Sequence, residues 1–322
     1  MGSTEKRPLG IPTVRDRVVQ TAVVHVLQPI FERDFAPTSY GFRPGRGAQQ
    51  ALDKVEALLA AGYGYVVDAD LKSYFDTIPH ERLLQRLRVK VADGRLLKRI
   101  ESFLKAGILE GLHEWSPTMG APQGAVRSPL LSNIYLDPLD HQMAARGVEM
   151  VRYADDFVIL CRTQAEAERA LEEVRSWVEA NGLTLHPDKT HIIEASTGAF
   201  EFLGYRYERG NCTVRPKSLE KLKASVRAKT RRTDGRSLAC LMADLNGTLR
   251  GWFAYFKRSG SRVFSNLDGW IRRRLRSLLR KRKKLKGISR HGADEQRWPN
   301  SFFAEAGLFS LKAAHAASVN PL

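Results

Sequence analysis

Apolar positions three or four residues apart predict several amphipathic helices in the first two thirds of the chain. Within residues 14–35, Val18, Ala22, Val26 and Ile30 recur at helical spacing and form the apolar stripe of such a helix. Other segments show helical patterns, or begin or end with helix signals. They are 46–61, 79–91, 94–106, the segment that opens with Ser128 and Pro129, and 164–181 followed by Gly182.

Strand patterns alternate with these helices. GYGYVVDADL (62–71) has the composition of a buried strand, and VEMVRY and FVILC are two more, separated only by the residues ADD. This short separation predicts a tight hairpin with two acids at its tip, and weaker strand signals follow in TLHPDKTHII and FEFLGYRY. The alternation favours an α+β sheet domain over residues 1–214 and a helical domain over 215–322.

Charge separates the same two regions. The formal net charge is +17, and residues 215–322 hold 26 Lys/Arg against 7 Asp/Glu, whereas residues 1–214 hold 26 against 28. A nearly neutral N-terminal region followed by a strongly cationic region indicates a surface that binds a polyanion. The alternative is a cationic face that is merely solvated.

Composition excludes several classes of protein. Hydrophobic residues make up 43% of the chain, which argues against wholesale disorder. The cysteines, Cys161, Cys212 and Cys240, lack metal-binding spacing and are too few for a disulfide framework, so a reducing compartment without structural zinc is expected. No apolar run approaches eighteen residues and the N-terminus lacks a signal-peptide core, so neither a membrane span nor secretion is expected.

The candidate chemistry is carried by acids at strand ends. Asp68 and Asp70 lie two residues apart in a strand pattern and therefore share one face, while Asp155 and Asp156 lie at the hairpin tip. If their strands are neighbours, these carboxylates form an oxygen-only site suited to Mg²⁺, and paired ions of this kind serve phosphoryl transfer. Each acid taken alone is also compatible with an ordinary turn, and Asp68 with a structural role.

The order of five blocks resembles the reverse transcriptases, and most closely the group II intron-encoded reverse transcriptase/maturases. The blocks are VVDADLKSYFDTIPHERLL, GAPQGAVRSPLLSNIYL, VRYADDFVILC, GLTLHPDKTHI and FEFLGYRY. This resemblance implies a right-hand polymerase palm, an antiparallel sheet with packed helices and remnant fingers, followed by an all-α thumb/maturase domain. It also implies RNA-directed DNA synthesis with two Mg²⁺ ions.

The resemblance assigns roles to individual residues. Asp70 and Asp155 match the metal-binding acids of the palm, and Asp156 matches the neighbouring acid that supports the metal site. Tyr74 or its neighbour Phe75 falls where the family places an aromatic gate against a ribose 2′-hydroxyl. An aromatic residue at this point is otherwise simply part of the core.

Further matches concern the nucleotide and the primer. Gln123 resembles the residue that lines the incoming nucleotide pocket, and Arg7 resembles the residue that pairs with the triphosphate. Lys189 is expected to donate a proton to the pyrophosphate leaving group, or else to be an exposed loop lysine. A primer-supporting hairpin, or alternatively a packed turn, is expected at Phe202, Leu203 and Gly204.

The cationic region contains RRRLRSLLRKRKKLK (272–286), which holds ten basic residues in fifteen and no acid. Leu275, Leu278 and Leu279 form one packing stripe, so the remaining surface suits the phosphate backbone of structured RNA. The aromatic residues Trp252, Tyr255 and Trp270 either stack on bases or belong to the core, which we favour. The residues expected to bind RNA are Arg272, Arg273, Arg274, Arg276, Arg280, Lys281, Arg282, Lys283 and Lys284.

Two features depart from the family pattern. Family members carry a longer fingers region ahead of KRPLGIP, and Arg127 stands where an apolar residue is usual. The first departure predicts that this chain binds RNA but extends primers weakly.

The expected partners are structured intron RNA, an RNA template, a DNA or RNA primer and deoxynucleoside triphosphates, in a bacterial cytoplasm. The alternatives are an RNA-binding splicing maturase with little polymerase activity, and a reverse transcriptase of another retroelement or a defence system.

Overall fold

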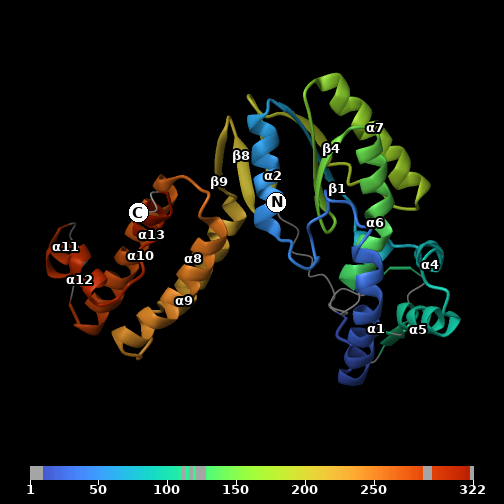
Figure 1. Ribbon diagram of the computed structural model, residues 1–322. Coiled ribbons are helices and arrows are strands. Elements are labelled where there is room, and N and C mark those ends of the chain that lie inside the picture. The colour runs from blue at the N-terminus through green and yellow to red at the C-terminus, as the bar shows by residue number, and fades with distance from the viewer. Residues whose placement is uncertain are drawn as a thin grey trace. The chain divides into compact units, whose positions relative to one another are not determined.

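The computed structural model describes residues 10–106, 108–110, 113–115, 119–120, 128–285 and 292–319. The chain divides into two compact units, Met1–Leu203 and Gly204–Leu322, called here the first and second unit (Figure 1). The sequence pattern placed the boundary at residue 214, whereas the units divide after Leu203. The strand pair that follows Leu203 therefore belongs to the helical second unit.

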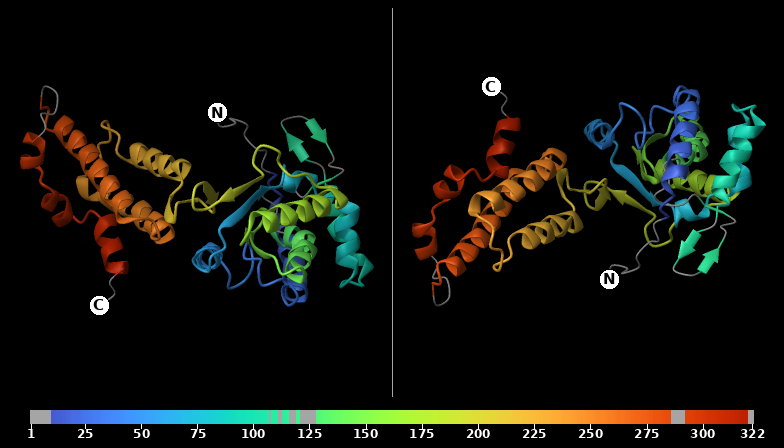
Figure 2. Two further views of the ribbon diagram at one scale, coloured as in Figure 1. Left: turned by 90° about the horizontal axis from the view of Figure 1, so that it is seen from above. Right: turned by 90° about the horizontal axis from the view of Figure 1, so that it is seen from below.

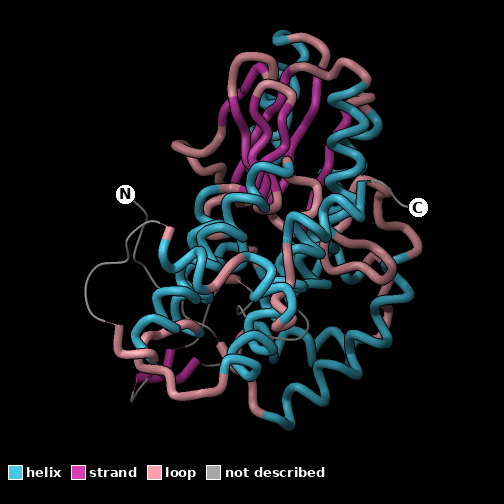
Figure 3. Tube along the Cα trace, turned by 90° about the vertical axis from the view of Figure 1, so that its left-hand side faces the viewer, coloured by secondary structure: helices cyan, strands magenta, loops and turns pink. Residues whose placement is uncertain are grey.

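A four-stranded antiparallel sheet forms the centre of the first unit, with its strands drawn in magenta in Figure 3. Its order is β4 (Glu149–Tyr153), β5 (Asp156–Cys161), β1 (Tyr65–Asp70) and β6 (His191–Glu194). β1 and β5 are the central strands and carry apolar side chains on both faces, which explains their nearly continuous hydrophobic sequences.

Helices cover both faces of this sheet, as Figure 1 shows for α2 on one side and α6 and α7 on the other. Val67 and Phe157 belong to the core shared with α6 and α7, whereas Val66 and Val158 are buried on the opposite face. The helices of the first unit are α1 (Val14–Glu32), α2 (Ala48–Ala60), α3 (Tyr74–Thr77), α4 (His80–Arg88), α5 (Gly94–Leu104), α6 (Ser128–Ala145) and α7 (Gln164–Ala180).

Most of the expected elements of this unit are confirmed. Gly182, the expected stop after α7, has a positive φ of 72°, which glycine adopts without strain. Elements that the sequence pattern did not predict are the short helix α3 and the strand pair β2 (Ile108–Glu110) and β3 (His113–Trp115). The strand β7 (Ala199–Phe202) completes the first unit.

The apolar stripe assigned to the first helix was wrong. α1 buries Val23, Leu27 and Phe31, while Val18 and Val26 of the expected stripe are 66% and 54% exposed. The helix carries apolar residues around most of its circumference, so helical spacing alone selected the wrong face.

The second unit begins with the hairpin β8 (Tyr205–Glu208) and β9 (Asn211–Val214) and continues as helices. The expected stripe Leu275, Leu278 and Leu279 is buried, so α10 packs as predicted. α13 packs against α10 (Figures 1 and 2). The helices are α8 (Pro216–Lys229), α9 (Leu238–Phe256), α10 (Ser261–Arg282), α11 (Ala293–Arg297), α12 (Asn300–Glu305) and α13 (Leu311–Val319).

Within the described ranges, no helix combines the length and the apolar character needed to cross a membrane.

Candidate active site

The central strands bring two of the predicted acids together. Asp70, the last residue of β1, lies directly opposite Asp156, the first residue of β5. Residues directly opposite in an antiparallel pair point to the same face, and Asp68 shares that face because it lies two positions along β1. The sheet therefore gathers three carboxylates at one end of one face.

The turn between β4 and β5 sets the position of the fourth acid. The strands pair up to Tyr153 and Asp156, which leaves Ala154 and Asp155 as a two-residue loop. Ala154 has a positive φ of 61°, which the favoured two-residue hairpin turns require at this position. Asp155 therefore follows a residue in a left-handed backbone conformation that is uncommon for alanine. Contacts from the surrounding structure must stabilise this conformation.

A buried ion pair holds this turn. The Arg152 side chain is fully buried, and its Nε donates to both carboxylate oxygens of Asp140 at 2.8 and 3.0 Å. Its Nη1 donates to the Ala154 carbonyl oxygen at 2.8 Å and to Asn133 Oδ1 at 3.0 Å. A charged pair in the interior is stable only when its remaining polar atoms are also paired, and here they tie the turn to α6.

Gly41 packs against the same turn. Its carbonyl oxygen accepts a hydrogen bond from Asn133 Nδ2 at 2.8 Å. A Cβ atom on Gly41 would lie 2.3 Å from the Ala154 nitrogen, so only glycine allows this approach. The sequence does not single out Gly41, Asn133, Asp140 and Arg152, because no local pattern shows that these residues meet.

The carboxylates strongly influence one another. Burial, followed by the charges of Asp68, Asp155 and Asp70, raises the pKa of Asp156 to about 7. Burial, followed by Asp70 and Glu201, raises the pKa of Asp68 to about 6. The site therefore places several carboxylates close together in a partly buried position. Glu201 of β7 contributes to it, although nothing in its local sequence singles it out.

Lys189 compensates part of this charge. Its Nζ lies 2.6 Å from Asp70 Oδ2, and both side chains are partly exposed. The loop that carries Lys189 is fixed to the end of β1, because the His186 backbone N–H donates to the Asp70 carbonyl oxygen at 2.7 Å. The expected role of Lys189 toward pyrophosphate stays a prediction, but its place beside Asp70 is a structural finding.

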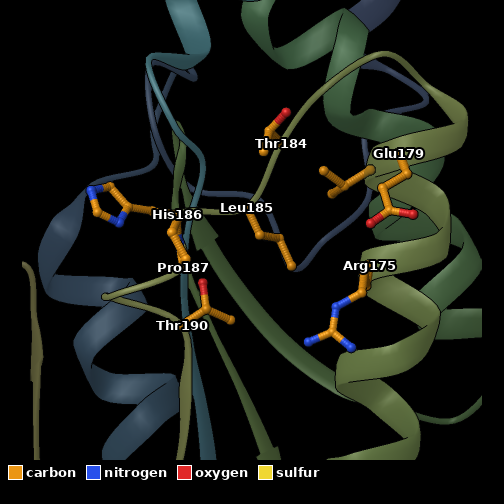
Figure 4. A pocket seen from close by; sticks show the side chains of 8 residues that line it. Arg175, Glu179, Thr184, Leu185, His186, Pro187 and Thr190 are labelled. Atoms are coloured by element: carbon orange, nitrogen blue, oxygen red, sulfur yellow. The ribbon is translucent and has the colours of Figure 1, made fainter.

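The same loop borders a cavity of about 200 Å³ (Figure 4). Arg175 and Glu179 of α7 line one side, while the His186 ring points away from them in Figure 4. Because both signs of charge line this cavity, it does not suit a triphosphate. The acids at the strand ends remain the candidate site.

The carboxylates fit a hard divalent cation by donor type, since Mg²⁺ prefers oxygen ligands. Within the described residues, no three His, Cys, Asp or Glu side chains are gathered in a metal-binding arrangement. The Asp70 carboxylate is directed to the Lys189 ammonium instead. Burial, with the charges of the neighbouring aspartates, raises the pKa of Asp156, and a bound divalent cation would neutralise this clustered negative charge.

The two candidates for the aromatic gate lie in different environments. Tyr74 is fully buried, its hydroxyl donates to the Ser132 carbonyl oxygen at 2.9 Å, and burial raises its pKa. Tyr74 is therefore a core residue, as the alternative interpretation held. Phe75 is only partly buried and meets the Tyr74 ring edge-on at 5.4 Å, so it remains the candidate.

The residues expected to support the primer lie where the first unit ends. Phe202 is buried in β7, and Leu203 has a positive φ of 48°. The Leu203 backbone N–H donates to the Asp156 carboxylate, which links this turn to the acids. Gly204, with φ of 82°, begins the second unit. The predicted contact of these residues with a primer stays a prediction.

Three residues singled out in the sequence lie outside the described part of the structure. They are Arg7, Gln123 and Arg127. Their predicted roles toward the nucleotide stay predictions.

The nine basic residues expected to bind RNA differ in their burial and in their partners. Arg276 is buried and donates to the Trp298 carbonyl oxygen at 2.9 Å, and Arg280 forms an ion pair with Asp294 at 2.9 Å. Arg276 therefore differs from the expected exposed cation, because it ties α10 to the segment at α11 and α12. Among the other seven residues, the partly buried ones are Arg272, Arg274 and Arg282, and the exposed ones are Arg273, Lys281, Lys283 and Lys284.

The family follows from comparison with known proteins. The model of the reverse transcriptase (RNA-dependent DNA polymerase) family matches residues 2–207, which contain all the acids of the candidate site. The chain belongs to this family. The model of the group II intron maturase-specific domain matches residues 219–298, so the reverse transcriptase domain and the maturase domain lie in the order that group II intron reverse transcriptase/maturases have.

Curated relatives agree with this assignment. Protein YkfC of Escherichia coli is 36% identical over 243 residues, which cover 63% of each chain. The group II intron-encoded protein LtrA of Lactococcus lactis is 41% identical over 138 residues, which cover 43% of this chain and 23% of LtrA. The chain therefore matches less than two thirds of the length of either relative.

The fold is similar to that of a distant polymerase. A telomerase from Candida albicans, solved with a fragment of telomeric RNA, superposes with a TM-score of 0.51 at 13% identity. The match covers 96% of this chain and 58% of the telomerase. At this identity the likeness supports the expected palm-type fold and nothing about substrates.

Proposed function

We propose that this chain is an RNA-directed DNA polymerase of a group II intron that also binds the intron RNA and assists its splicing. The observation that carries the polymerase part is the pairing of Asp70 with Asp156 beside the hairpin residue Asp155. The family to which the chain belongs generally uses Mg²⁺. Asp70 and Asp155 would hold two Mg²⁺ ions, with Asp156 adding negative charge behind them.

The reaction is the attack of a primer 3′-hydroxyl on the α-phosphorus of a deoxynucleoside triphosphate, which releases pyrophosphate. When bound, the two ions activate the attacking hydroxyl and stabilise the leaving oxygen. Lys189 exchanges its contact with Asp70 for one with the leaving pyrophosphate and donates a proton there. Phe75 limits the space at the ribose 2′ position, and the turn at Leu203 supports the primer end.

The second unit contributes the RNA-binding part. Its sequence matches the maturase-specific domain, and its exposed cations supply a positive surface for the phosphates of the intron. Four substrates and partners follow from this proposal. They are structured intron RNA, an RNA template, a DNA or RNA primer and deoxynucleoside triphosphates.

The test is an incorporation assay with the chain, an RNA template, an annealed DNA primer and labelled deoxynucleoside triphosphates. The proposal expects Mg²⁺-dependent extension copied from the template, and faster splicing of a group II intron when the chain is added. A chain that gives no more extension than a heat-inactivated sample would contradict the polymerase part. A chain that leaves splicing unchanged would contradict the maturase part.

A further inference from the structure

A small basic cavity lies within the second unit, where α8 ends beside α10. Its volume is about 210 Å³, and it is lined by Thr230, Arg232, Trp270, Arg273, Arg274 and Ser277. Its lining contains three guanidinium groups and no carboxylate. This composition differs from the cavity beside α7, which Arg175 and Glu179 line together.

One of the three guanidinium groups is held in place. Arg274 Nε donates to Thr230 Oγ1 at 2.9 Å, and its Nη2 donates to the Thr230 carbonyl oxygen at 3.3 Å. The Arg274 guanidinium also lies 5.5 Å from the centre of the Trp270 ring, and that of Arg227 lies 5.6 Å from it. The contacts order one wall of the cavity before any ligand binds, which reduces the entropy lost on binding.

The positive charge of the cavity is poorly compensated. Arg232 and Arg273 are exposed and form no ion pair with a carboxylate in the described part of the chain. Glu220 lies 3.6 Å from Arg227, but it makes its shorter contact with Lys223 at 2.9 Å. Burial, followed by the charges of Arg227 and Arg232, lowers the pKa of Arg274. The uncompensated positive charge of the cavity therefore favours the binding of an anion.

The size and the type of donor narrow the class of anion. A volume of about 210 Å³ is smaller than the cavities of about 300–1,000 Å³ that enclose drug-sized ligands, but it accommodates a single phosphate group. Arginine forks match the oxygens of a phosphate in pairs, which lysine cannot do. Trp270 offers an apolar wall for the sugar or base attached to that phosphate.

We propose that Arg232, Arg273 and Arg274 form a pocket that binds one backbone phosphate of the intron RNA beside Trp270. This inference rests on the proposed RNA-binding function and assigns to it a defined contact point. In this arrangement Arg274 is the fixed donor, and Arg232 and Arg273 close on the phosphate from the solvent side. Arg276 and Arg280 are excluded from this contact, because they bond to the segment at α11 and α12.

The test compares two double variants that remove the same charge. R232A/R273A alters the pocket, and K221A/R262A removes two exposed cations of the same unit that do not line it. The dissociation constant for a folded group II intron RNA is measured by filter binding over a series of KCl concentrations, and circular dichroism verifies folding. The pocket variant should lower the slope of log K against log salt by up to about 0.7–0.9, the change expected for the loss of one phosphate contact. The control should change the slope by less than half as much.

Two outcomes would overturn the proposal. Equal changes in the two double variants would overturn the pocket while leaving RNA binding by the basic surface intact. A parent chain that does not bind the intron RNA would overturn the proposed function and the pocket together.

A second measurement needs no variant. Intron RNA containing 4-thiouridine should crosslink to the α10 peptide that contains Trp270 and Arg273. Crosslinks that map only to other peptides of the second unit would also overturn the pocket.

Discussion

Arg152 donates a hydrogen bond to the carbonyl oxygen of Ala154 at 2.8 Å, one residue before the candidate metal ligand Asp155. The same guanidinium is paired with Asp140, and both side chains are fully buried. The geometry of the acidic turn therefore depends on a charge pair that never meets the substrate. Arg152 is a positioning residue in this account.

The first prediction separates the stability supplied by this pair from its positioning effect. Arg152→Met leaves the Asp140 carboxylate buried without its partner, which should lower the free energy of unfolding by about 3–5 kcal/mol. The double variant Arg152→Met/Asp140→Leu removes both charges and should recover most of that loss. Urea denaturation of the parent and the two variants measures the difference.

Primer extension by the double variant supplies the second readout. The turn loses its hydrogen bond at Ala154 in both variants, so extension should remain at least about tenfold below the parent even where stability recovers. Full activity in the stable double variant would show that the pair serves folding alone.

A second prediction concerns the close approach of Gly41 to the turn. The Cβ atom of Gly41→Ala would overlap the Ala154 nitrogen, so the turn must shift, at a cost of about 1–3 kcal/mol. Gly64→Ala is the matched control, because a Cβ at Gly64 meets nothing within 4 Å. Thermal unfolding of both variants tests the prediction, and similar melting temperatures would contradict it.

A third prediction concerns Lys189. If it donates a proton to pyrophosphate, Lys189→Met should lower the rate of primer extension by roughly 10²–10⁴-fold, while the affinity for the primer–template stays the same. Lys98→Met, which removes an exposed lysine of α5, should have little effect. A loss of affinity without a loss of rate would indicate that Lys189 only neutralises Asp70.

A fourth prediction tests the fold through its thiols. Burial, followed by Glu166, raises the pKa of Cys161 to about 11, so roughly one molecule in a thousand carries this thiolate at pH 8. Cys240 is exposed. Maleimide labelling followed by peptide mass spectrometry should modify Cys240 first and leave Cys161 unmodified until the chain unfolds. Equal labelling of the two under native conditions would contradict the position of β5.

Sequence reasoning succeeded where the signal was local. The strand pattern predicted the position of Asp70 at the end of a strand, and the short hairpin predicted that of Asp155. Both signals depend only on neighbouring residues, through period-two alternation and hairpin length. It failed for α1, where Val18 and Val23 are equally apolar and only tertiary packing decides which of them is buried.

Tertiary packing also decides the environments of Tyr74, Phe75 and Arg276. Tyr74 and Phe75 are adjacent aromatic residues, and their opposite environments follow from the position of α6, which no local pattern encodes. Arg276 belongs to a strongly basic stretch without acids, yet its partners Trp298 and Asn300 lie more than twenty residues later. Contacts between residues far apart in the sequence therefore determine which basic side chains have structural partners and which stay available for RNA.

The most direct test of the central claim is single-nucleotide incorporation by Asp70→Asn and Asp155→Asn, measured with saturating primer–template and Mg²⁺. Glu305→Gln, which removes an exposed carboxylate of the second unit, is the control. We expect at least about a thousandfold loss in each aspartate variant, equivalent to about 4 kcal/mol of transition-state stabilisation, with RNA binding retained. Incorporation within tenfold of the parent in either aspartate variant would contradict the assignment of these acids as metal ligands.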